Sequence, residues 1–213
     1  MNPNRSSAVM QQRTEPLDSL DDFPTPPWAT RALMKTVFGV PRVYKSVLDP
    51  AAGRGTMLRP LSEYFREVRG FDIHDYGVGV PVQDYFTWTP TAEQRPDWII
   101  TNPPFKHGME FALRALDQAN DGVALLLRTA FIEGKKRYEE LFRDRPLTHF
   151  CPFVERVPMV KGRLDKKASS ATSYSWFVWR SRSFAPTTVL HIPPCRKELE
   201  KDTDYDFLFD KAN

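Results

Sequence analysis

The run of six apolar residues at positions 122–127, Gly-Val-Ala-Leu-Leu-Leu, most constrains what this chain can fold into. A short apolar run bounded by polar residues is typical of a strand that is buried on both faces of a sheet. The segments before it alternate between strand and helix patterns: strands are expected at 46–49, 68–73 and 98–101, and helices at 29–38, 57–68 and 110–119. This alternation predicts a doubly wound α/β sheet whose first strands are parallel.

The region after this run changes character, because three strand patterns follow with no helix between them. They lie at 147–153, 155–160 and 173–179. The last two are expected to form an antiparallel hairpin, joined by the polar, basic loop 161–172. The sequence therefore predicts a seven-stranded mixed sheet with an antiparallel hairpin at one edge.

Length and composition limit the class of protein. The 213 residues suit one main domain, which we place at 23–185 between a flexible, polar N-terminal arm (1–22) and a C-terminal tail (186–213). No apolar stretch is long enough for a transmembrane helix, and the first residues do not form a secretory signal. Two Cys cannot build a disulfide framework. We therefore expect a cytoplasmic protein with no membrane partner.

The net charge of +3 is unevenly distributed along the chain. Residues 128–180 carry a net charge of +6, whereas the parts on either side are slightly negative. The basic runs at 135–137 and 161–167 could grip the phosphates of a nucleic acid. A solvated, solubilising surface explains the same runs equally well.

The expected strand at 46–49 delivers an acid to a glycine-rich turn, Asp49-Pro50-Ala51-Ala52-Gly53-Arg54-Gly55. Small residues let the backbone approach a ligand closely, but the turn lacks both the full dinucleotide-binding glycine pattern and the Gly-Lys-Ser/Thr of a phosphate loop. A ligand with amine and ribose groups suits this turn, and an ordinary strand-to-helix turn fits it equally well. Asp72, about 20 residues further on, is placed to accept hydrogen bonds from ribose hydroxyls.

The strongest motif is the tetrad Asn102-Pro103-Pro104-Phe105, directly after the expected strand at 98–101. Doubly wound sheets bind ligands at the carboxyl ends of their strands. Two prolines fix the backbone and remove two N–H donors, so local carbonyls and the Asn102 side-chain oxygen remain as acceptors for an amino group. Phe105 offers a flat apolar face on which a base could stack. A turn that merely ends the strand is the less favoured interpretation.

These motifs together resemble the S-adenosylmethionine-dependent amino-methyltransferases, and most of all the compact, phage-like N6-adenine type. Segments 23–28, 83–86 and 174–179 are also similar to motifs of that family, and the resemblance covers residues 23–180. It implies a Rossmann-like class I methyltransferase fold, S-adenosylmethionine as the cofactor, no metal, and methyl transfer to the exocyclic N6 amine of adenine in DNA.

The resemblance also implies roles for the matching residues. The cofactor-binding residues would be Thr25 and Trp28 at the methionine moiety, Asp49, Ala51, Gly53 and Gly55 in the glycine loop, Asp72 and Ile73 at the ribose end, and Asp84 and Tyr85 at the adenine. The catalytic residues would be Asn102, Pro103, Pro104 and Phe105. Asn102 and the Pro103 carbonyl would accept hydrogen bonds from the target amine, and Phe105 would stack on a base flipped out of its duplex. Positioning and electrostatic stabilisation would then account for the rate enhancement.

The chain departs from the family because 131–147 is too short for a separate target-recognition insert. Recognition would come from the basic loops, from DNA shape, or from a homodimer or protein partner. Three other functions stay open: adenine methylation of RNA, glutamine methylation of a protein, and a degenerate methyltransferase fold that binds nucleic acid or protein. Phe105 weighs against glutamine methylation, where Tyr is usual, and DNA is favoured over RNA.

One further set of residues suggests different chemistry. His149, Cys151, His191 and Cys195 are of the types that bind zinc. Their spacing matches no common zinc module, and a proline follows Cys151 directly, so no metal site is expected. His107 lies close to the tetrad, and a surface histidine at a helix start is its favoured interpretation.

Overall fold

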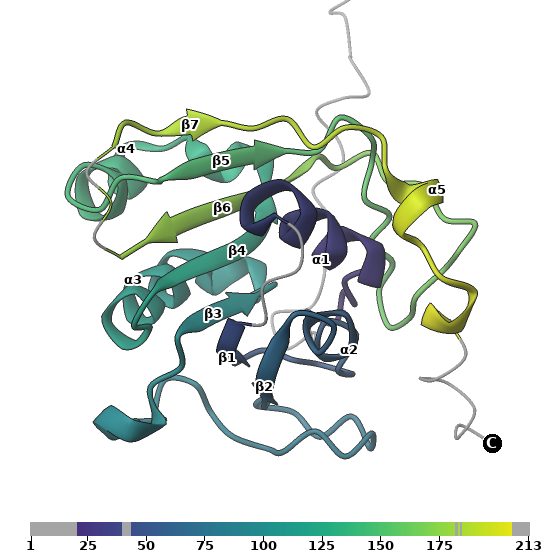
Figure 1. The fold of residues 1–213 in the computed structure, drawn as a ribbon, viewed down its shortest axis with the longest axis horizontal. Helices are drawn as coiled ribbons and strands as arrows, with labels where there is room; N and C mark the ends of the chain where they lie inside the picture. Colours follow the sequence, from purple (N-terminus) through teal and green to yellow (C-terminus); the bar gives the residue numbers. More distant parts are fainter. Residues whose placement is uncertain (1–20, 40–43, 182, 184, 206–213) are drawn as a thin grey trace, which may run out of the picture.

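The computed structural model describes residues 21–39, 44–181, 183 and 185–205. Within these residues, seven strands form one sheet in the order β2-β1-β3-β4-β6-β5-β7 (Figure 1). The strands are β1 (Tyr44–Asp49), β2 (Phe65–Gly70), β3 (Trp98–Thr101), β4 (Gly122–Arg128), β5 (His149–Pro152), β6 (Tyr174–Arg180) and β7 (Thr188–Val189). Strands β2, β1, β3 and β4 are parallel, β6 is antiparallel to β4 and β5, and β7 is parallel to β5. The predicted Rossmann-like mixed sheet is confirmed.

Helices cover both faces of the sheet. The described helices are α1 (Pro27–Leu33), α2 (Leu58–Leu61), α3 (Gly108–Gln118), α4 (Lys135–Arg137) and α5 (Arg196–Leu199). Wider π-helical turns extend α1 to Phe38 and α4 to Phe142. Residues of β4 alternate between the layers, since Ala124 and Leu126 pack with α1 and α2, whereas Leu125 and Leu127 pack with α3. The run at 122–127 is thus buried on both faces, as predicted.

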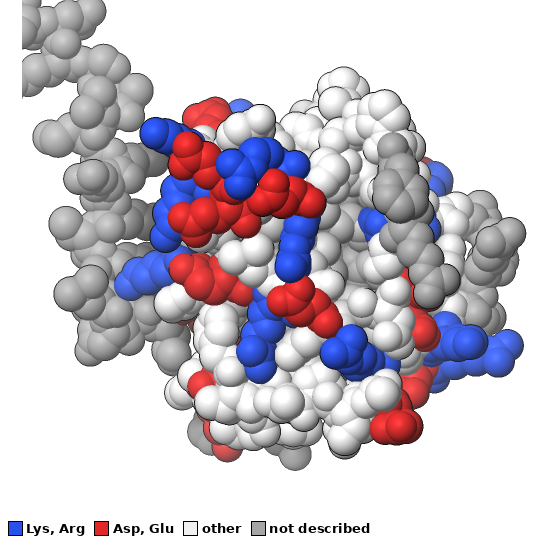
Figure 2. Space-filling view, turned by 90° about the vertical axis from the view of Figure 1, so that its left-hand side faces the viewer, with Lys and Arg blue, Asp and Glu red and all other residues white. Residues whose placement is uncertain are grey.

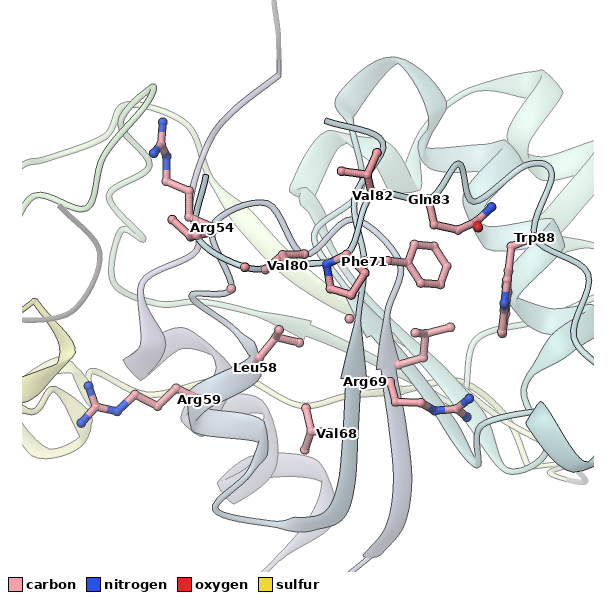
Figure 3. A pocket seen from close by; sticks show the side chains of 16 residues that line it. Arg54, Leu58, Arg59, Val68, Arg69, Phe71, Val80, Val82, Gln83 and Trp88 are labelled. Carbon is pink, nitrogen blue, oxygen red and sulfur yellow. The ribbon is translucent and has the colours of Figure 1, made fainter. Parts of the chain in front are cut away.

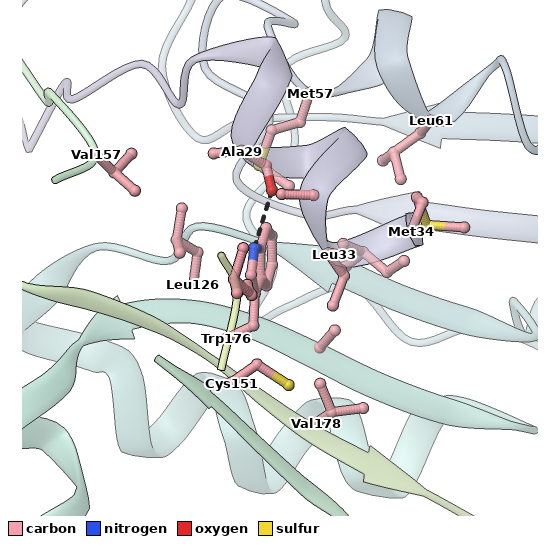
Figure 4. Packing of buried hydrophobic residues seen from close by; sticks show 14 of the residues in the cluster. Ala29, Leu33, Met34, Met57, Leu61, Leu126, Cys151, Val157, Trp176 and Val178 are labelled. Atoms are coloured by element: carbon pink, nitrogen blue, oxygen red, sulfur yellow. Dashed lines mark hydrogen bonds between the residues drawn. The ribbon is translucent and has the colours of Figure 1, made fainter. Parts of the chain in front are cut away.

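The core on the α1 side is built around a fully buried tryptophan of β6 (Figure 4). The Nε1–H of Trp176 donates a hydrogen bond to the backbone carbonyl of Ala29 in α1 (3.0 Å). Leu33, Leu126 and Val178 lie in the same cluster. Burial of an aromatic ring and satisfaction of its N–H together fix α1 against the sheet.

The helix expected at 57–68 is wrong over most of its length. The structure forms a helix only at Leu58–Leu61, and β2 already begins at Phe65. The spacing of Leu58, Leu61, Phe65 and Val68 fits a helical face, but Phe65 and Val68 pair in parallel register with Tyr44 and Val47 of β1. Pairing with β1 therefore outweighs the helical spacing of these apolar residues. The strand expected at 68–73 consequently lies at 65–70.

The expected antiparallel hairpin is present, but β5 at 149–152, not 155–160, is the strand that pairs with β6. Among the described residues, 155–160 forms no strand, and the antiparallel partners of β6 are β4 and β5. Pro158 has no N–H for a ladder, and the alternating Val157 and Met159 are instead buried in the core. The seventh strand is β7, a short segment that the sequence did not indicate.

Part of the C-terminal tail packs against the domain. Beyond β7 and α5, a short 3₁₀ turn at Asp202–Asp204 brings Asp204 to α1. Its carboxylate accepts two hydrogen bonds from Arg31 (2.8 and 2.9 Å), and Arg31 also binds Glu63 (2.7 Å). Residues 1–20 of the predicted arm and Phe207 and Phe209 of the tail lie outside the described residues.

Candidate active site

Three parallel strands bring the predicted site residues to one edge of the sheet. Asp49 ends β1, Asn102 follows β3, and Asp72 follows β2. Because β1 lies between β2 and β3, the carboxyl ends of these strands are neighbours. The edge is the one at which doubly wound sheets bind ligands.

The glycine loop is held in place by the second acid. The Asp72 carboxylate accepts hydrogen bonds from the backbone N–H groups of Gly53 (2.8 Å) and His74 (3.0 Å). Gly53 and Gly55 have φ angles of 53° and 76°, which side chains rarely adopt, so glycine is required at both positions. Ala51 is half-buried beside them, and the Ile73 side chain is 66% exposed.

Asp49 is a buried carboxylic acid at the base of the glycine loop. Its side chain accepts a hydrogen bond from the N–H of Ala51 (3.2 Å). Burial raises the pKa of Asp49 to about 7, and nearby Asp72 adds to the increase. Burial also raises the pKa of Asp72. Two adjacent acids with raised pKa values are stabilised in their ionised form by a cation.

The side-chain amide of Asn102 is oriented by the segment before α1. Its Nδ2 donates to the backbone carbonyl of Phe23 (3.0 Å) and lies 3.8 Å from the Met159 sulfur. The Oδ1 atom is buried and has no hydrogen-bond partner among the described residues. A buried acceptor without a partner is costly, so this oxygen is available to an N–H donor of a ligand.

Phe105 lies in an aromatic and cationic environment. Its ring centroid is 5.4 Å from that of Phe23 and 6.2 Å from that of Tyr174, and the Arg128 guanidinium carbon lies 4.5 Å from it. The Phe105 N–H donates to the Asp21 carboxylate (2.5 Å). Pro103 is buried and Pro104 is half-buried. The tetrad is therefore a packed surface rather than a free loop.

The proline-rich segment at 21–28, which leads into α1, links the tetrad to the glycine loop. Asp22 pairs with Arg54 of the loop (3.2 Å). Thr25 is buried, and its hydroxyl has no hydrogen-bond partner in the described part of the chain. Trp28 is buried in the core with its ring edge-on to Phe153 (5.6 Å). The Trp28 Nε1–H, like the Thr25 hydroxyl, is buried and has no hydrogen-bond partner among the described residues.

The segment 83–86 contributes one exposed ring. The Asp84 carboxylate accepts the N–H of Phe86 (2.8 Å), which forms a local turn. Tyr85 is buried against Phe111 (4.8 Å between centroids). Phe86 is 41% exposed, and its ring lies 5.8 Å from that of His107, next to the tetrad. Phe86 rather than Tyr85 presents an open aromatic face.

A pocket of about 820 Å³ opens beside β2 (Figure 3). It borders the glycine loop at Arg54 and Gly55, and Val68 of β2, Val80 and Trp88 line it further. Asp49, Asp72 and Asn102 do not line it. The pocket therefore adjoins the candidate site without containing its polar groups.

Neither a metal-binding cluster nor a membrane-spanning helix is present in the ranges that the structure describes. There, no group of three or more His, Cys, Asp or Glu side chains is arranged to hold a metal ion. Cys151 and Cys195 are buried, and burial raises the pKa of the Cys151 thiol to about 12. In the same ranges, every helix is too short or too polar to cross a bilayer.

Four residues of the site were not identified from the sequence: Asp21, Phe23, Arg128 and Met159. The sequence pattern places Asp21 in the N-terminal arm and Met159 in a strand. The signal for Phe23 was its place at the start of the proline-rich segment. Arg128 directly follows the apolar run of β4, where a cation at the carboxyl end of a strand indicates a site.

The fold is shared with known methyltransferases. The methyltransferase subunit of a type I restriction-modification system from Streptococcus thermophilus superposes on 86% of this chain with a TM-score of 0.59 and 11% identity. A candidate RNA methyltransferase from Pyrococcus horikoshii superposes on 78% of the chain, and on 91% of its own length, with a TM-score of 0.56 and 17% identity. The modification subunit of a candidate type I restriction enzyme from Vibrio vulnificus YJ016 gives a TM-score of 0.55 over 86% of the chain at 15% identity.

These similarities define a class by fold. The chain has the Rossmann-like fold of the methyltransferases. It spans 50% of the length of each type I subunit. No protein-family model and no curated protein sequence matches it.

Proposed function

We propose that the protein transfers a methyl group from S-adenosylmethionine to the exocyclic N6 amine of adenine in DNA. The observation that carries this proposal is the Asn102 side chain, whose Oδ1 is a buried acceptor without a partner, while its Nδ2 is committed to the Phe23 carbonyl. An amide held in this way presents oxygen, not nitrogen, to a ligand. It is suited to a planar amine that has two N–H groups to donate.

The residues at the strand ends fit the cofactor. Asp49 and Asp72 are adjacent acids, Gly53 and Gly55 admit a ligand close to the backbone, and the Thr25 hydroxyl is buried without a described partner. S-adenosylmethionine, when bound, supplies an electrophilic methyl group on a positively charged sulfur. We assign Asp49 and the glycine loop to its amino-acid end, Asp72 and Ile73 to its ribose end, and Asp84 to its adenine.

The tetrad would perform the positioning. Asn102 Oδ1 and the Pro103 carbonyl hold the two amine protons, which directs the nitrogen lone pair toward the methyl donor. As positive charge develops on nitrogen, these fixed acceptors stabilise it without reorganisation. The Phe105 ring supports the plane of the base.

A labelled-methyl assay tests the proposal. The purified protein is incubated with labelled S-adenosylmethionine and either unmethylated DNA or RNA, and the products are digested to nucleosides and identified by mass. We expect N6-methyladenine in the DNA digest. Label in RNA alone would mean that RNA, not DNA, is the substrate. Cofactor binding without label in either nucleic acid would indicate a protein substrate. Absence of cofactor binding would favour a degenerate binding module.

A matched pair of variants ties the activity to the site. Asn102→Ala should lower the rate of transfer by about 10²–10³-fold, because it removes an acceptor that acts on the transition state. Asn120→Ala is the control, since Asn120 is exposed after α3. It should change the rate by less than about twofold. Equal activity of both variants would contradict the role of Asn102.

A further inference from the structure

The connection between β5 and β6 gathers exposed positive charge next to the candidate active site. Its five cationic side chains are all exposed: Arg156, Lys161, Arg163, Lys166 and Lys167. With its two acids, Glu155 and Asp165, the connection keeps a net charge of +3. Glu155 turns inward and accepts the N–H groups of Cys195 (2.6 Å) and Arg196 (2.7 Å), and the half-buried Asp165 pairs with Arg163 (3.1 Å). Lys166 pairs with Asp202 of the C-terminal segment (2.8 Å).

Buried side chains fix this connection against the tetrad. Val157 and Met159 belong to the core on the α1 side, and the Met159 sulfur contacts the Asn102 amide. The Gly162 N–H donates to the carbonyl of Asp22 (2.8 Å), next to the Asp21 carboxylate that binds the Phe105 N–H. The cations are therefore carried by a segment that is anchored at the site.

Arg128 continues the positive charge across the tetrad. Its guanidinium lies over the Phe105 ring, and in the β4–β6 ladder it is paired with Tyr174. Arg156 contacts the side chain of Ser173, the neighbour of Tyr174. Arg128 thus lies over the Phe105 ring, and Arg156 contacts the residue that precedes Tyr174. Arginine combines phosphate binding with stacking on flat rings, so it suits the surroundings of an extruded base.

The side of the molecule that carries α3 and α4 differs in charge. Figure 2 shows Lys and Arg interleaved with Asp and Glu on that face. Lys135 pairs with Glu139 (3.8 Å), and Arg145 pairs with Asp117 (2.8 Å). The basic run at 135–137 is therefore part of a mixed surface, in which acids reduce its attraction for a polyanion.

We propose that the segment 154–172, together with Arg128, is the DNA-binding element of this protein. It holds the phosphates on either side of the target adenine while that base lies on Phe105. The proposal rests on the proposed function and assigns to this connection the binding of the DNA backbone next to the candidate active site. Contacts of this kind position a strand and read little sequence.

Salt-dependent binding to DNA tests this element separately from catalysis. The probe is a fluorescein-labelled, unmethylated duplex of 20 base pairs, and anisotropy gives the affinity at several salt concentrations. One triple variant replaces Arg156, Lys161 and Arg163 by alanine. The matched control replaces Lys135, Lys136 and Arg137 by alanine, so that both variants lose three positive charges.

We expect the first variant to bind about tenfold or more weakly and to lower the slope of log affinity against log salt by ~2–3, since each phosphate contact contributes about 0.9. The control should keep the slope of the wild-type protein. Equal weakening of both variants would overturn the proposal in favour of a net-charge effect, and an unchanged first variant would overturn it directly. Tighter binding of a 20-nucleotide RNA through the same residues would overturn the choice of DNA.

A single substitution tests the same element with less risk that the variant fails to fold. Lys161→Gln removes one exposed charge and leaves Val157 and Met159 in place, so it should lower the slope by about 0.9. If the wild-type protein transferred no methyl group to DNA, the proposed function would be refuted, but the binding result would stand. Normal methyl transfer with unaltered binding by both loop variants would refute only the DNA-binding element.

Discussion

The side-chain nitrogen of Asn102 donates a hydrogen bond to the backbone carbonyl of Phe23, 79 positions earlier in the chain (3.0 Å). This bond determines which end of the amide faces the candidate site. It also makes the segment before α1 part of the site, although that segment contributes a backbone atom rather than a reactive side chain.

Asn102→Asp tests this relationship. A carboxylate has no N–H, so the Phe23 carbonyl would lose its donor and face a second acceptor. We expect the free energy of unfolding to fall by about 1–3 kcal/mol. Urea denaturation measures the change, with Asn120→Asp as the exposed control. An Asn102→Asp variant as stable as the control would show that the bond does not orient the amide.

The raised pKa of buried Asp49 predicts a specific dependence of the free energy of unfolding on pH. Burial raises its pKa in the folded protein to about 7, from an ordinary value of 3.8. The unfolded chain therefore releases this proton at lower pH than the folded protein, and Asp49 lowers the free energy of unfolding progressively as the pH rises from about 4 to 7. The full loss of stability is present at pH values above the pKa of Asp49 in the folded protein. It is absent at pH values below the pKa of Asp49 in the unfolded chain.

Asp49→Asn should remove this dependence. We expect the variant to gain stability relative to the wild-type protein between pH 4 and pH 8, by up to roughly 4 kcal/mol. Urea denaturation at several pH values measures the difference. Asp121→Asn, at an exposed acid, is the control. A constant difference across this range would show that Asp49 titrates with an ordinary pKa.

Asp204 and Asp202 form a natural comparison, because they lie two residues apart but differ in burial. Asp204 is 3% exposed and binds buried Arg31, whereas Asp202 is exposed and pairs with Lys166. Asp204→Ala leaves Arg31 with Glu63 and the Leu199 carbonyl, and it should cost about 3–5 kcal/mol of unfolding free energy. Asp202→Ala should cost less than about 1 kcal/mol. Thermal and urea unfolding distinguish the two, and equal costs would mean that the C-terminal turn does not hold α1.

Trp176→Phe tests the bond between β6 and α1. It removes the donor to the Ala29 carbonyl inside the core, and an unsatisfied buried carbonyl costs about 1–3 kcal/mol beyond the change in volume. Trp179→Phe makes the same change in volume. It frees the carbonyl of Arg145, whose bond is only partly buried, so water can replace the donor. We expect the Trp176 variant to unfold at the lower urea concentration, and the reverse order would contradict this assignment.

Local patterns were sufficient for much of the sheet. The apolar runs of β3 and β4 and the polar residues after β1 and β3 are short-range signals, and the structure places them as expected. The prolines of the tetrad mark the end of β3 in the sequence. Asp49, Asp72 and Asn102 could be placed together because parallel neighbours share an edge.

Long-range contacts account for what the sequence did not predict. Phe65 begins a strand because it pairs with Tyr44, which competes with the helical spacing from Leu58. Val157 and Met159 have the alternation of a strand but are anchors of an irregular segment. The partners of Asn102, at Phe23 and Met159, lie 79 and 57 positions away. No local pattern encodes such pairs.

The attachment of α1 has a consequence for the order of synthesis. Ala29 is bound by Trp176, 147 positions later, and Arg31 is bound by Asp204, 173 positions later. A nascent chain that has emerged only as far as β4 already contains the glycine loop and the tetrad, but it lacks the residues that seat α1 and, through it, the carbonyl beside Asn102. A domain generally folds as a unit, so residues that emerge last can be needed to complete it. The site is therefore completed late, by residues that take no direct part in it, and an interrupted chain would carry the glycine loop and the tetrad without the contacts that seat them.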